Sequence, residues 1–173
     1  MGASKRMEVL KGAVLSLLMD AYQKRNKIGM VSFRREDAKL ILPFTNSVEL
    51  GEKLLKDLPT GGKTPLSKGF LKSYEAIINE MRKNPYIIPV VIFISDFKPN
   101  VAYGKNAIEE VYTICEKFIE KEINVVLIDT EVDNFIKIGI GKKLSEMFNF
   151  TYYKIDNLTK EDLIKIANNY YHG

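Results

Sequence analysis

The sequence has very few of the residues that build disulfides, metal clusters and nucleophilic triads. Its 173 residues include one cysteine, Cys115, one histidine, His172, and no tryptophan. A single cysteine excludes an internal disulfide and any multi-cysteine zinc site. A single histidine next to the C-terminus leaves almost nothing for a histidine-based metal cluster or a Ser/His/Asp triad. The sequence therefore points away from many classes of hydrolase.

Long apolar runs and blocks of charge are also missing. The longest apolar stretches, around residues 87–94 and 13–19, are far shorter than the roughly 20 residues of a membrane-spanning helix. The basic start leads into a helical pattern, which is not typical of a signal peptide. The formal net charge is +4, but the lysines are scattered along the chain. We therefore expect a cytoplasmic protein with neither a membrane nor a nucleic acid as partner.

The residues that are present predict one domain, residues 1–173, in which helices alternate with strands. The composition, 46% hydrophobic and 28% charged, is that of an ordinary globular chain without linkers or repeats. Apolar spacing predicts helices over 5–24, 48–58, 65–81, 104–121 and 140–148, with a last helix capped by Thr159. Ser47 is predicted to cap the second helix. Strands are predicted over 27–33, 38–45, 87–94, 123–128 and 150–155.

This order of elements predicts a layered α/β sheet. The short connection between the first two strands predicts an antiparallel pair. Residues 87–94 are apolar on both faces, as expected of a central parallel strand. Such folds usually open with a buried strand, whereas here a helix comes first. Either the fold lacks an opening strand or that strand lies upstream of the first residue.

Candidate functional residues follow the predicted strands, because ligands of open α/β sheets bind beyond the carboxyl ends of the strands. Asp96, the glycine loop 60–64 and residues 129–131 occupy such places. A hydroxyl and a carboxylate without histidine or cysteine suit a hard cation such as Mg²⁺. An aspartate after a strand can equally cap a turn. A nucleotide-binding loop is rejected, because Asp57 stands where that motif needs glycine.

Three segments resemble the von Willebrand factor type A domain of the magnesium chelatase D subunit and related cobaltochelatase-like proteins. They are Lys11-Gly-Ala-Val-Leu-Ser-Leu-Leu, Leu58-Pro-Thr-Gly-Gly-Lys-Thr-Pro-Leu and Val126-Leu-Ile-Asp-Thr-Glu. The resemblance spans nearly the whole chain. It implies a Rossmann-like, doubly wound α/β fold, with a mostly parallel sheet, one antiparallel edge strand and helices on both faces. The first central strand of that fold has no counterpart in the sequence.

The resemblance also implies a metal-ion-dependent adhesion site. In the family, this site combines an Asp-x-Ser-x-Ser motif with a threonine and an aspartate, which Thr64 and Asp96 match. The Asp-x-Ser-x-Ser motif is absent, and Phe97 replaces a common glycine. We therefore expect Mg²⁺ or Mn²⁺ at a weak or incomplete site. Its partner-binding rim would be formed by Gly61, Gly62, Lys63 and Phe97.

The function implied by the resemblance is a non-catalytic interaction module of a magnesium-chelatase-like assembly in tetrapyrrole biosynthesis. Its ion would bind an acidic residue of an ATP-hydrolysing or porphyrin-binding chelatase subunit. Three outcomes are open for the missing first strand: the two half-sheets close up directly, another chain donates a strand, or a preceding polypeptide supplies it. We expect the third. One alternative is a metal-independent scaffold with a decayed adhesion site. Another is a small metal-dependent phosphoesterase that uses Asp96 and Asp129 as ligands.

Overall fold

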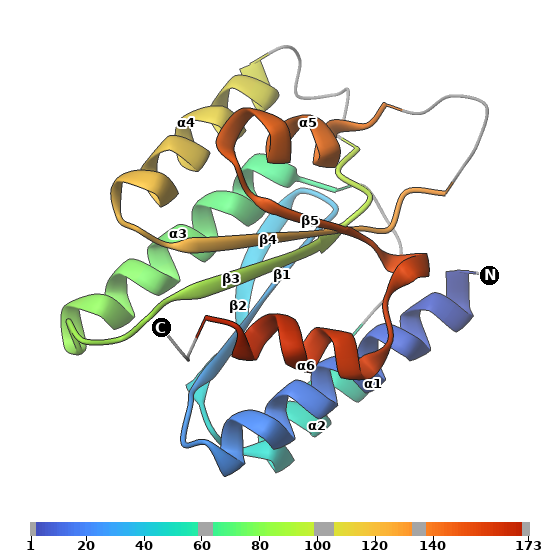
Figure 1. Ribbon diagram of the computed structural model, residues 1–173, viewed down its shortest axis with the longest axis vertical. Coiled ribbons are helices and arrows are strands. Elements are labelled where there is room, and N and C mark those ends of the chain that lie inside the picture. The colour runs from blue at the N-terminus through green and yellow to red at the C-terminus, as the bar shows by residue number, and fades with distance from the viewer. Residues whose placement is uncertain (1–2, 59–63, 99–105, 133–137, 171–173) are drawn as a thin grey trace. The chain divides into compact units, whose positions relative to one another are not determined.

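The fold is described from a computed structural model that covers residues 3–58, 64–98, 106–132 and 138–170. Helices and strands alternate along most of the chain (Figure 1). The helices are α1 (Ala3–Gln23), α2 (Val48–Lys56), α3 (Leu66–Lys83), α4 (Asn106–Glu120), α5 (Ile140–Phe148) and α6 (Lys160–Asn168), with a short 3-10 helix, η2 (Ile155–Asn157). The strands are β1 (Ile28–Arg34), β2 (Asp37–Thr45), β3 (Val90–Ser95), β4 (Asn124–Asp129) and β5 (Thr151–Lys154).

Local sequence signals account for several helix starts. The Ser47 hydroxyl accepts a hydrogen bond from the backbone N–H of Leu50 at 3.3 Å, which confirms the predicted cap of α2. Thr159 forms a capping box with Asp162 at the start of α6, which confirms the second predicted cap. Among the described helices, none is both long enough and apolar enough to cross a bilayer.

The strands form two sheets within the described residues. β1 and β2 form one sheet, and the two residues between them leave room only for an antiparallel turn. The other sheet has the order β3-β4-β5, and all of its strands are parallel. β4 lies between two neighbours and is buried along almost its whole length. β3, which the sequence predicts to be central, lies at the edge of its sheet and is less buried.

The chain divides into two compact units, and the larger one contains the three-stranded sheet. This unit comprises the described parts of residues 33–39 and 62–158. Its core is a group of aromatic rings from α3, β3 and α4. The rings of Phe70 and Phe93 stack with their centroids 3.9 Å apart, and Phe118 meets Phe70 edge-on at 6.3 Å. These contacts fix α3 and α4 against β3.

The other unit comprises the described parts of residues 1–32, 40–61 and 159–173. Its core centres on Leu18 of α1, Leu42 of β2 and Leu55 of α2. Gly51 lets α1 and α2 pack closely, since a Cβ at this position would overlap the end of the Leu18 side chain. α6 also packs along α1 in this unit.

Candidate functional site

Strand register brings the ends of β3, β4 and β5 to one edge of the sheet. Ser95 pairs with Asp129, and Asp129 pairs in turn with Lys154. The backbone N–H of Thr130 donates to the Ser95 carbonyl at 2.9 Å, which extends the pairing past the end of β4. The residues that follow these strands therefore start from one row, at the edge where ligands of parallel sheets bind.

Asp96 lies on the turn that directly follows β3, and its side chain is half-buried. Its Oδ1 atom accepts a hydrogen bond from the backbone N–H of Lys98 at 3.1 Å. The Ser95 hydroxyl accepts a second bond across the same turn, from the N–H of Phe97 at 3.0 Å. Among the described residues, none donates to Asp96 Oδ2.

Thr64, the second predicted ligand, lies just before Pro65 and the start of α3 and is also half-buried. Its carbonyl accepts a hydrogen bond from the N–H of Leu66 at 3.0 Å, which ties it to the first turn of the helix. Thr64 and Asp96 belong to the same compact unit. Gly61, Gly62 and Lys63, the predicted rim residues that precede Thr64, lie outside the described residues.

Phe97 is fully buried, with 0% of its surface exposed. The prediction that its side chain forms part of a partner-binding rim is therefore corrected, because a buried ring offers no surface to a partner. Its backbone is left-handed, with φ of 52°. Glycine adopts this conformation far more readily than other residues, so it is the favoured residue at such a position. In this protein a phenylalanine with a buried side chain adopts this left-handed conformation.

Asp129, at the end of β4, is 1% exposed and is bound within the protein. Its Oδ1 accepts the backbone N–H of Glu131 at 2.7 Å. Its Oδ2 accepts the hydroxyl of Tyr152 at 2.6 Å and lies 3.5 Å from the Lys154 ammonium. Both carboxylate oxygens thus have partners from the chain itself.

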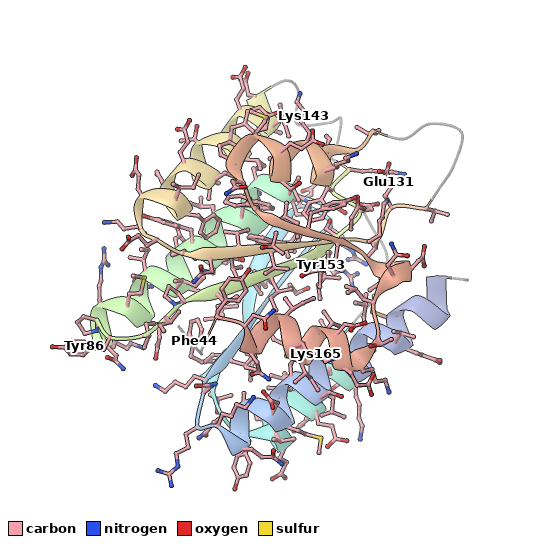
Figure 2. The ribbon with its side chains drawn as sticks, viewed as in Figure 1. Phe44, Tyr86, Glu131, Lys143, Tyr153 and Lys165 are labelled. Atoms are coloured by element: carbon pink, nitrogen blue, oxygen red, sulfur yellow. The ribbon has the colours of Figure 1, made fainter. Side chains whose placement is uncertain are left out.

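Glu131 connects the end of β4 to the start of α5, as its place in Figure 2 illustrates. Its side-chain oxygens accept the backbone N–H groups of Ile138 at 3.2 Å and Gly139 at 3.3 Å. The ammonium of Lys98 lies 3.9 Å from Oε1. Gly139 is the N-cap of α5 and offers no capping side chain, so Glu131 accepts hydrogen bonds at the helix start instead.

The two predicted ligands, Thr64 and Asp96, suit a hard cation by the type of their side-chain oxygens. No group of three or more His, Cys, Asp or Glu side chains that could hold a metal occurs in the described part of the chain. A hydroxyl and a carboxylate are the oxygen ligands that Mg²⁺ takes, and Mg²⁺ commonly keeps several waters. The Asp96 Oδ2 atom, without a donor from the described residues, fits such an ion. Thr64 would supply the hydroxyl.

Two residues of this edge, Tyr152 and Lys154, were not predicted from the sequence. Both lie on the short strand β5, and both bind Asp129. The parallel register of β4 and β5 would have identified Lys154 as a partner, because it places Lys154 beside Asp129. Sequence reasoning predicted both strands but not their register, so it could not pair these side chains.

Cys115 is the remaining group of chemical interest in this unit. Cys115 lies on helix α4, and 0% of the residue is exposed. Burial, together with the smaller effect of the nearby charge of Glu116, raises the pKa of Cys115 to about 12. A thiol in this state is neither a nucleophile nor a metal ligand near neutral pH.

Comparisons with known proteins identify both the fold and the family. No protein-family model matches the sequence. An uncharacterised protein of Methanocaldococcus jannaschii is 64% identical over 167 residues, covering 96% of each chain. The magnesium-chelatase 67 kDa subunit of Chlorobaculum tepidum is 31% identical over 95% of this chain. This chain spans only 28% of that subunit's length.

The fold has a counterpart among solved structures. The crystal structure of the SpRpn10 von Willebrand factor type A domain superposes with a TM-score of 0.65 at 14% identity. The superposition covers 92% of this chain and 82% of that domain. The chain therefore belongs to the von Willebrand factor type A domains of the magnesium chelatase family.

Proposed function

We propose that this chain is a non-catalytic interaction module that binds an acidic side chain of a partner through a divalent cation. Asp96 carries the proposal. It lies at the ligand-binding edge of the sheet, and Oδ2 accepts no hydrogen bond from the described residues. Thr64 is the second ligand, and water completes the coordination of Mg²⁺ or Mn²⁺. With only two protein ligands, the affinity for the ion alone is low.

Partners of chelatase type follow from the relationship to the Chlorobaculum subunit. We propose that they are the ATP-hydrolysing and porphyrin-binding subunits of such an assembly, and that the chain acts in tetrapyrrole biosynthesis. The ion would leave a coordination position open to a carboxylate of the partner.

Isothermal titration of Mn²⁺ and Mg²⁺ into the wild-type chain tests the metal site. Asp96→Ala and Thr64→Ala should each abolish the binding heat. Asp37→Ala is the matched control, because Asp37 is an exposed aspartate at the start of β2. Binding that is equal in all four proteins would refute the assignment of the site.

Capture of purified chelatase subunits on the immobilised chain tests the partner. We expect capture in Mg²⁺ and its loss in EDTA or with Asp96→Ala. Capture that is unchanged in EDTA and with Asp96→Ala would instead support the alternative, a scaffold that binds without metal.

The environment of Asp129 argues against the phosphoesterase alternative. That reaction would need Asp129 as a second metal ligand beside Asp96. Tyr152 and Lys154 already bind one of its oxygens, and the Glu131 N–H binds the other. A metal ion at Asp129 would have to displace these groups and approach a lysine ammonium. The absence of phosphoester turnover in Mn²⁺ would agree with this reasoning.

A second proposal concerns the edge of β3 that faces away from β4. Along that edge β3 has no strand partner among the described residues, although its side chains are strongly apolar. Unpaired strand edges bind extended segments readily. We propose that a further polypeptide segment pairs there as the first central strand of the sheet. Slower amide exchange along β3 in a protein extended upstream would support this, and unchanged exchange would refute it.

A further inference from the structure

We infer that Phe97 is a positioning residue for Asp96: its ring anchors the turn after β3 to the start of α5. The inference deepens the proposed function, because the carboxylate that it positions is the proposed metal ligand. The anchoring itself is a property of the apo protein. It can therefore be tested whether or not an ion binds.

The backbone of Phe97 first shows that an anchor is needed. A φ of 52° is disfavoured for a residue with a bulky side chain, and such a conformation persists only where its surroundings determine it. The side chain supplies those surroundings, because it is fully buried. Packing of the ring therefore holds the turn in a conformation that the backbone alone would not favour.

Gly141, in the first turn of α5, forms the socket for this ring. A Cβ at position 141 would lie 2.7 Å from Cδ2 of Phe97 and 3.3 Å from Oδ2 of Asp129. The first distance is too short for any side chain, so the helix can approach the ring only with glycine here. The ring of Phe97 therefore occupies the space that a side chain at position 141 would need.

The socket is itself tied to the end of β4. Glu131 accepts the backbone N–H groups of Ile138 and Gly139, three and two residues before Gly141. Lys98, the residue after Phe97, places its ammonium 3.9 Å from the same carboxylate. Both the ring and the residue that follows it are thus held by the segment that leads into α5.

The anchored turn in turn orients the Asp96 carboxylate. Asp96 is flanked by two bonds across the turn, from the Phe97 N–H to Ser95 and from the Lys98 N–H to its own Oδ1. Both donors belong to the segment that the ring immobilises. If the ring is lost, the Lys98 N–H separates from Oδ1 more often, and the carboxylate loses its fixed direction.

Hydrogen exchange and Mn²⁺ titration of Phe97→Ala test the inference. Phe118→Ala is the matched control, since Phe118 is also 0% exposed but lies in the aromatic core between α3 and α4. The measured quantity is the exchange rate of the Lys98 amide divided by that of a β4 amide, which removes the effect of global unfolding. We expect this ratio to rise in Phe97→Ala and to stay at its wild-type value in Phe118→Ala.

The Mn²⁺ affinity should fall by about 10- to 100-fold in Phe97→Ala, as for other losses of support behind a ligand, and should be unchanged in Phe118→Ala. Phe97→Leu, which keeps an apolar side chain, should restore most of both readouts. Gly141→Ala should raise the exchange ratio from the other side of the contact, without altering the turn sequence. It also serves if Phe97→Ala does not fold.

An equal exchange ratio in wild-type, Phe97→Ala and Gly141→Ala proteins would overturn the inference, as would an equal rise in Phe118→Ala. The proposed function fails separately. If the wild-type chain binds no Mn²⁺ while the exchange ratio rises only for the variants at the contact, Phe97 positions the turn but the turn holds no ion.

Discussion

Two glutamates form ion pairs with the same N···O distance but differ in burial. They therefore test how burial changes the contribution of a side chain to the free energy of unfolding. Glu131 lies 3.9 Å from the Lys98 ammonium, and Glu146 lies 3.9 Å from that of Lys142. The Glu131 side chain is 3% exposed and the Glu146 side chain 67%. Glu131 also accepts two backbone N–H groups. We therefore expect very different costs from truncating them to alanine.

The loss of unfolding free energy in Glu131→Ala follows from the groups that lose their partner, which are two backbone N–H groups and the Lys98 ammonium. Each orphaned backbone donor costs about 1–3 kcal/mol, and the lower end applies because Ile138 is 53% exposed and water can reach it. The ion pair adds at most about 1 kcal/mol, since Lys98 is 38% exposed and solvent screens it. The sum is about 2–3 kcal/mol of unfolding free energy. Glu146→Ala should cost less than about 0.5 kcal/mol.

Urea unfolding of the two variants, followed by circular dichroism, measures this difference. Glu131→Gln should fall between wild type and Glu131→Ala, because its amide keeps one acceptor oxygen. Raising the salt concentration should reduce the small effect at Glu146 and leave most of the effect at Glu131. Equal costs at the two positions would refute the reasoning, because burial and backbone acceptance would then contribute nothing.

Three further predictions concern other parts of the chain. Gly51→Ala should cost about 1–3 kcal/mol in urea unfolding by overpacking against α1, whereas Gly12→Ala should be neutral or stabilising, since its new Cβ meets only the flexible end of a lysine side chain. Hydrogen bonds from Thr159 lower the pKa of Asp162, so Thr159→Ala should raise that pKa toward its ordinary value in an NMR titration. Cys115 should react with a thiol reagent at pH 8 only after unfolding, because burial raises its pKa to about 12.

Each of these has a distinct contrary outcome. Equal costs for Gly51→Ala and Gly12→Ala would show that the close helix contact is not a constraint. The lowered pKa of Asp162 implies stability that is present above its ordinary pKa and lost as the pH falls through the lowered one. Thr159→Ala should reduce that acid-dependent part, because it removes the hydroxyl bond but keeps the backbone N–H bond, and an unchanged pH profile would contradict a role for the hydroxyl. Rapid labelling of native Cys115 would contradict its burial.

The sequence predicted elements well wherever local chemistry determines them. Ser47 and Thr159 cap helices as predicted, because a cap needs only the residue and the N–H groups two or three positions later. Strand 87–94 was predicted to begin too early. Pro89 lacks an N–H and so cannot donate to a ladder, and β3 begins immediately after it, at Val90. Its carbonyl still accepts the N–H of Asn124.

Position in the sheet was harder to predict, because it depends on neighbours rather than on the strand itself. Residues 87–94 are apolar on both faces, which is typical of a central strand. Among the described residues β4 has strands on both sides and β3 on one side only. The apolar pattern of β3 therefore predicted a neighbour that these residues do not supply, and the proposed pairing of a further segment along its free edge would resolve this difference.

The acids after the strands show why a site is harder to predict than a fold. Asp96 and Asp129 both follow strands that the sequence predicts from their apolar residues, so the sequence offers each as a ligand. The two aspartates differ in the hydrogen-bond and ion-pair partners of their carboxylate oxygens. Both carboxylate oxygens of Asp129 have partners, namely a backbone N–H at Oδ1 and Tyr152 and Lys154 at Oδ2. The last two partners depend on the strand register. Asp96 is bound at Oδ1 by a donor two residues away, and none of the described residues donates to its Oδ2. The proposal therefore places the ion at Asp96 rather than at Asp129, on a difference in hydrogen bonding that the sequence pattern alone does not show.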